Sequence, residues 1–262
     1  MFYPSFTITS QWASDTLTPA QIGVRAIETF RRLESISPAM RTWTLVEDGK
    51  PVPLSAATAR MTSVVEGSLK WKHPDRRDNP SHGYAVVARG AQVESEFGSA
   101  GTAHLWITAG AKFGDRISFA IGDILFPPDF SLVTYPLYRA SLETLASIWP
   151  VPWALAYTFS TETPPIDAKT GSGLKRQSPF EVAWIAYLSP ALALGLEPPP
   201  EIVSERTPGG GMILSAAPGL IDPQNPDHMR RSRALQAIMT ERVGTKDQHL
   251  GPKDHAAREG PY

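Results

Sequence analysis

Three apolar stretches in the middle of the chain constrain its fold more than any other feature. They read YAVVARGA (residues 84–91), AHLWITAG (103–110) and RISFAIGD (116–123), and each is typical of a strand. The connections between them leave no room for a crossover helix. The three stretches therefore predict an antiparallel meander and argue against βαβ units.

Helices are predicted where apolar residues recur at helical spacing. The first follows Thr18, because Thr18 and Gln21 form a capping-box pattern around Pro19. The others are expected from about Ser55, around residues 138–149, and after Asn225. Further strands are expected in 5–12, 41–47, 153–160, 180–188 and 211–217. This order predicts an α+β fold, a mainly antiparallel sheet with helices packed on it, in a single large domain over residues 1–243. Residues 244–262 have almost no apolar content, which predicts a disordered tail.

Composition narrows the functional classes. The 262 residues carry a formal net charge of −1, so no overall field attracts nucleic acid or anionic lipid. The absence of cysteine excludes thiolate nucleophiles, cysteine-based zinc sites and disulfides. Neither a secretory signal nor an uncharged apolar run of about 18 residues is found. We therefore expect a soluble, cytoplasmic protein with no direct contact to nucleic acid or membrane.

The glycine run GGG (209–211) is the most conspicuous short motif. A phosphate-binding P-loop needs Lys and Ser or Thr directly after its last glycine, and Met212 and Ile213 stand there instead. A dinucleotide fingerprint lies between a strand and the helix after it, whereas these glycines precede a strand. The run therefore predicts a tight turn.

Two other patterns invite a catalytic interpretation. The segment KTGSGLK (169–175) contains fragments of two serine β-lactamase signatures, but they are in the wrong order and in one loop. The segment HPDRRDNPSH (73–82) offers His73, Asp75, Asp78 and His82 as ligands for a divalent metal. A metal-dependent hydrolase using this loop is therefore kept as an alternative. Asp227 and His228 suit the first turn of a helix without a catalytic role.

Several separated motifs resemble one known family. ITSQW (8–12) and ETFRRLESISPAMRTW (28–43) are similar to the beginning of immunity protein 52 domains, in which a tryptophan follows the first strand and a second follows a helix and a proline. WIAYLSP (184–190) and GGGMILSAAPGLIDPQNPDHMRRSRAL (209–235) are similar to the end of those domains. The resemblance spans residues 5–243.

The resemblance implies a protein that binds and neutralises a cognate type VI secretion toxin carrying a restriction-endonuclease-like DNase domain. It implies no catalytic residue, metal or cofactor. Two loops are the candidate contacts, because aromatic and charged loop residues are frequent at interfaces. They contribute Glu94, Glu96 and Phe97 from one loop, and Trp71, Asp75 and Asp78 from the other. An effector chaperone or adaptor is a further alternative, and the sequence leaves a homodimer open.

Overall fold

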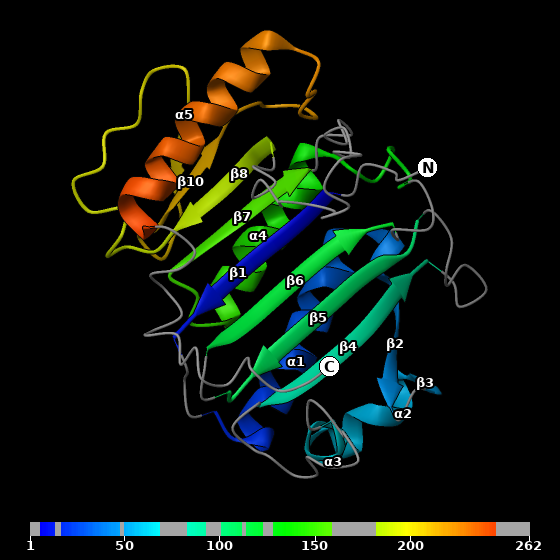
Figure 1. Ribbon diagram of the computed structural model, residues 1–262. Coiled ribbons are helices and arrows are strands. Elements are labelled where there is room, and N and C mark those ends of the chain that lie inside the picture. Colours follow the sequence, from blue (N-terminus) through cyan, green and yellow to red (C-terminus); the bar gives the residue numbers. More distant parts are fainter. Residues whose placement is uncertain are drawn as a thin grey trace, which may run out of the picture.

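Strand β1 (Phe6–Trp12) lies in the middle of a ten-stranded sheet (Figure 1). The computed structural model describes residues 6–13, 17–47, 50–68, 83–92, 101–111, 114–122, 128–158 and 182–244. The strand order is β3-β2-β4-β5-β6-β1-β7-β8-β10-β9, and every neighbouring pair is antiparallel. The other strands are β2 (Thr42–Glu47), β3 (Lys50–Pro53), β4 (Tyr84–Ala91), β5 (Ala103–Ala109), β6 (Asp115–Ile121), β7 (Trp153–Thr158), β8 (Val182–Leu188), β9 (Val203–Arg206) and β10 (Met212–Ser215). The predicted α+β class and the β4–β5–β6 meander are confirmed.

Helices lie on both faces of this sheet, but unevenly. Helices α1 (Pro19–Ile36) and α4 (Tyr135–Ile148) lie behind it in Figure 1 and contact each other. Helices α2 (Leu54–Ala57) and α3 (Met61–Gly67) lie beside the β2–β3 end, and α3 packs on α1. Helix α5 (Pro226–Val243) lies in front, against β8. No helix in the described ranges is long and apolar enough to cross a membrane.

The helix starts follow the capping signals in the sequence. Thr18 caps α1, and its side chain and that of Gln21 exchange bonds with the backbone as a full capping box. The Asn225 side chain accepts hydrogen bonds from the first turn of α5, where Asp227 complements the helix dipole. Helix α5 ends at Val243 with Gly244 as its C-cap, and the tail predicted beyond it lies outside the described residues.

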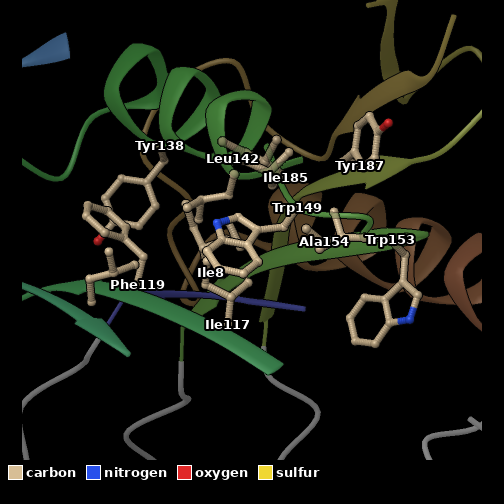
Figure 2. Packing of buried hydrophobic residues seen from close by; sticks show 14 of the residues in the cluster. Ile8, Ile117, Phe119, Tyr138, Leu142, Trp149, Trp153, Ala154, Ile185 and Tyr187 are labelled. Atoms are coloured by element: carbon tan, nitrogen blue, oxygen red, sulfur yellow. The ribbon is translucent and has the colours of Figure 1, made fainter. Parts of the chain in front are cut away.

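Large buried side chains fill the space between α4 and the middle of the sheet. Figure 2 shows Tyr138, Leu142 and Trp149 facing strand residues that include Ile8 and Phe119. The same figure shows Tyr187 and Trp153 on opposite sides of the sheet. All seven residues of β8 are buried, because α4 lies on one of its faces and α5 on the other.

Three local features differ from the sequence predictions. The continuous helix expected from Ser55 is broken, because a 3-10 turn (Thr58–Arg60) separates α2 from α3. Strands β3 and β9 were not predicted at all. Both are four-residue edge strands without an alternating apolar pattern, and β3 contains Pro51 and Pro53. Proline is tolerated in a sheet only at such an edge, since it cannot donate to a second neighbour.

Candidate protein-binding surface

The front of strands β4, β5 and β6 is not covered by any helix of the described chain (Figure 1). Side chains alternate along these strands, so one set points back into the core and the other points forward. The forward set occupies nine positions, which we call the open face. It consists of Ala85, Val87, Arg89, His104, Trp106, Thr108, Arg116, Ser118 and Ala120.

Trp106 is the centre of the open face. Its neighbours across the sheet are Val87 on β4 and Ser118 on β6. The side chain is 50% exposed, and its Nε1–H donates to Oγ1 of Thr108 at 3.3 Å. This bond lays the indole along its own strand. Tryptophan is enriched at protein interfaces, because its ring offers a large apolar contact area and its N–H a polar one.

Two arginines flank this tryptophan on opposite sides. In the sheet, Arg89 lies opposite His104 and Arg116 lies opposite Thr108. Each arginine is therefore on a strand next to β5, two residues away from the position opposite Trp106. Strand spacing and rise place each arginine Cα about 8 Å from that of Trp106, and the two arginines about 17 Å apart on a diagonal. Both are exposed, and neither makes an ion pair or a side-chain hydrogen bond with the described chain.

The open face has no acidic residue at any of its nine positions. The nearest carboxylate on these strands belongs to Asp115, which is buried and accepts a hydrogen bond from the Ala111 N–H at 2.9 Å. Among the described residues, the open face is therefore locally positive, in a chain of net charge −1. The small side chains around Trp106 also leave a hollow of about 280 Å³, lined by residues that include Trp106, His104 and Arg116.

A second hollow, of about 600 Å³, lies on the covered side of the sheet between α4 and the β9–β10 turn. Arg32, Glu143 and Tyr187 are among its lining residues. Its charged groups are already paired, because Arg32 binds Glu28 and Glu143 binds Arg139, each at 2.7 Å. Burial raises the pKa of Tyr187, and the negative charge of Glu143 adds to that rise. The hollow thus offers a ligand no unpaired charge from these residues.

The glycine run forms the turn that closes the β9–β10 hairpin. The Thr207 N–H donates to the Gly211 carbonyl, and the Gly210 N–H donates to the Thr207 carbonyl, both at 2.9 Å. Gly210 has φ of +80°, and a Cβ at Gly211 would lie 2.7 Å from the Tyr187 ring. The prediction of a tight turn is confirmed. Because Gly211 has no side chain, the backbone of the turn can pass close to the Tyr187 ring.

The other sequence candidates divide into two groups. Asp227 and His228 lie at the start of α5, where the His228 Nδ1 accepts from the Asp222 N–H at 3.1 Å and orders the preceding turn. The proposed contacts Trp71, Asp75, Asp78, Glu94, Glu96 and Phe97 lie outside the described residues, as do His73, His82 and the segment 169–175. Within the described ranges, no three acidic or histidine side chains gather as a metal site would require.

Comparison with solved structures gives a distant likeness. No family model and no curated protein matches the sequence. A solved structure titled Pseudomonas aeruginosa T6SS protein PA0821 aligns with 90% of this chain and 73% of its own, at 13% identity and a TM-score of 0.49. That neighbour is a type VI secretion system protein by its title. A likeness this distant does not bear on what the present chain binds.

Proposed function

We propose that this chain is an immunity protein that neutralises a type VI secretion toxin by binding it in a stoichiometric complex, without catalysing a reaction. The motifs at 8–12, 28–43, 184–190 and 209–235 motivate the proposal through their resemblance to immunity protein 52 domains. Within that family the sequence resembles TsiT, which neutralises the nuclease toxin TseT. The toxin expected here is likewise a DNase with a restriction-endonuclease-like domain.

The observation that carries the proposal is the open face, where the half-exposed Trp106 lies between Arg89 and Arg116, two arginines that form no ion pair with another described residue. Tryptophan and arginine are the residues that most often dominate binding energy at protein interfaces. They stand on central strands of a sheet that helices support from behind. Binding to such a rigid surface requires little ordering of the backbone, which lowers the entropic cost of association.

The chemistry of the open face favours binding over catalysis. General acid–base or nucleophilic chemistry needs a base and an orienting group within hydrogen-bond reach of a nucleophile. The nine positions of the open face include a single imidazole, that of His104, and no carboxylate. It does have an aromatic surface, two guanidinium groups and a shallow hollow, which suit recognition of another protein.

The test is a titration of the purified protein into the nuclease domain of the proposed toxin, with plasmid cleavage as the readout. Loss of cleavage at an equimolar ratio is the expected result. Unchanged cleavage without a detectable complex would overturn the proposal. A complex that leaves cleavage intact would identify an adaptor instead. Stoichiometric zinc or manganese in the purified protein would favour the hydrolase alternative at His73, Asp75, Asp78 and His82.

A further inference from the structure

We infer that the open face receives a carboxylate-rich segment of its protein partner, in which acidic side chains flank an apolar one. This inference rests on the proposed function for the identity of the partner as a toxin. It specifies that the toxin presents acidic groups to this chain. An inhibitor that imitates DNA would instead be acidic itself and would contact basic groups of the toxin.

Charge is the first reason. Arg89 and Arg116 contribute two positive charges, and no open-face position contributes a negative one. Neither guanidinium is neutralised by the described chain. Like charges brought together across an interface are strongly unfavourable, whereas carboxylates form short, bidentate bonds with arginine. An acidic partner segment is therefore favoured over a basic one.

The spacing of the groups is the second reason. An extended segment of about five residues covers the diagonal of about 17 Å between the arginine Cα atoms. Its middle would lie over Trp106, where the hollow of about 280 Å³ is bordered by Ala120 and Val87. A hollow of this size suits one side chain of a protein partner, since sites for small ligands are mostly larger, about 300–1,000 Å³. The geometry thus matches an apolar side chain between two carboxylates.

This chemistry has a consequence for how inhibition works. The DNA-binding cleft of a nuclease is basic, because phosphate contacts dominate its affinity for DNA. The open face would be repelled by such a cleft. We therefore expect Arg89 and Arg116 to contact an acidic part of the toxin, away from its DNA-binding cleft. Nucleic acid itself is a poorer occupant, since two arginines in a chain of net charge −1 form no continuous basic stripe.

The experiment compares two charge-matched variants of the full chain by calorimetric titration into the toxin domain. The test variant carries Arg89→Glu and Arg116→Glu. The control carries Arg206→Glu and Arg233→Glu, which reverse two exposed arginines on β9 and α5. We expect the test variant to lose at least about tenfold in affinity and the control to change less than about threefold. Circular dichroism melts confirm that both variants fold.

The wild-type affinity should also fall as ionic strength rises, because exposed charge pairs are screened. Equal affinity of the folded test variant and the control would overturn the inference while leaving the toxin complex, and so the proposed function, intact. A gain in affinity of the test variant would overturn it too, since that result would mean that the open face meets a basic surface.

A second measurement separates the inference from the proposed function if the toxin does not bind. Fluorescent peptides with a central phenylalanine flanked by glutamates, or by lysines, are titrated into the wild type and the test variant. Preference of the wild type for the glutamate peptide, lost in the test variant, would support the inference alone. Equal binding of both peptides would overturn it. Tighter, arginine-dependent binding of a short DNA duplex than of the glutamate peptide would also overturn it.

Discussion

The Nε1–H of Trp149 donates to Oγ1 of Thr29 at 3.0 Å, although the two residues lie 120 positions apart in the chain. Trp149 caps the end of α4, and Thr29 lies within α1. Both side chains are buried. The Thr29 hydroxyl in turn donates to the Arg25 carbonyl at 2.8 Å, which fixes its orientation. This buried polar contact thus links the end of α4 to α1 behind the sheet.

Replacing this acceptor tests the contact directly. In Thr29→Val the shape is nearly kept, but the Trp149 N–H is left buried without a partner. We expect the free energy of unfolding to fall by about 1–3 kcal/mol, measured by urea denaturation. Thr29→Ser keeps the hydroxyl and is the control, with a smaller loss. Wild-type stability of Thr29→Val would show that the bond contributes nothing.

The glycine turn provides a matched pair of substitutions. A Cβ at Gly211 would lie 2.7 Å from the Tyr187 ring and 2.8 Å from the Leu188 carbonyl oxygen, whereas a Cβ at Gly209 meets nothing within 4 Å. We expect Gly211→Ala to lower the free energy of unfolding by about 1–3 kcal/mol and Gly209→Ala to change it by less than about 0.5 kcal/mol. Valine at Gly210 or Gly211 should damage folding before it selectively abolishes binding. Equal stability of the two alanine variants would contradict the close approach at Gly211.

Much of the fold can be predicted from local sequence signals, namely helix caps and the alternation of apolar residues along strands. The capping box at Thr18 and Gln21 and the cap at Asn225 were read correctly, because a cap involves residues only two or three apart. The antiparallel meander of β4, β5 and β6 is predicted correctly, because short connections between alternating strands allow few other ways for these strands to pair. Strands β3 and β9 escaped prediction because an edge strand has one neighbour and needs no apolar alternation.

The open face depends on information that the sequence does not state. The alternation of apolar and polar residues predicts that Arg89, Trp106 and Arg116 each point out of the core on their own strand. It does not predict how the strands are aligned with one another. Only the register Val87↔Trp106↔Ser118 brings the two arginines onto one diagonal. Which face the helices cover is likewise a tertiary property. The sequence alone therefore predicts charged loops as contacts and does not single out the sheet.

Tyr138 predicts an alkaline loss of stability. Its buried hydroxyl donates to the Phe6 carbonyl at 2.9 Å and accepts from the Ile121 N–H at 3.3 Å, and burial raises the pKa of this phenol well above its usual value. The neutral form is thus favoured in the folded state. Its stabilising effect is complete below the unfolded pKa of about 10 and is lost as pH rises further, by at most about 1.4 kcal/mol per pH unit.

Tyr138→Phe removes this dependence. At pH 7 we expect it to be about 1–2 kcal/mol less stable than the wild type, because two buried backbone groups lose their partner. That deficit should shrink as pH is raised above about 10, since only the wild type has this phenol to ionise on unfolding. Urea denaturation across the alkaline range measures both quantities. A deficit that stays constant with pH would contradict the assignment.

Arg139 joins α4 to the edge strand β9. Its Nε donates to Glu205 at 2.5 Å and its Nη1 to Glu143 at 2.7 Å. These side chains are partly exposed, so we expect Glu205→Gln to lower the free energy of unfolding by only about 0.5–1 kcal/mol. Amide hydrogen exchange should accelerate in β9 more than in the central strands. Glu143→Gln is the control, because its partner lies on the same helix. Unchanged exchange in β9 would exclude the anchoring role.

Trp106 should matter for binding and little for folding. Because half of its surface is already exposed, Trp106→Ala should lower the free energy of unfolding by no more than about 2 kcal/mol. Trp184→Ala, at a fully buried tryptophan, should cost about 3–5 kcal/mol and serves as the contrast. Acrylamide should quench a part of the wild-type fluorescence that Trp106→Ala lacks. Affinity for the toxin should fall at least about tenfold in Trp106→Ala and less in Trp106→Phe, which keeps an aromatic ring. A large loss of stability in Trp106→Ala would mean that its indole packs as a core residue, and the open face would then not be a free surface.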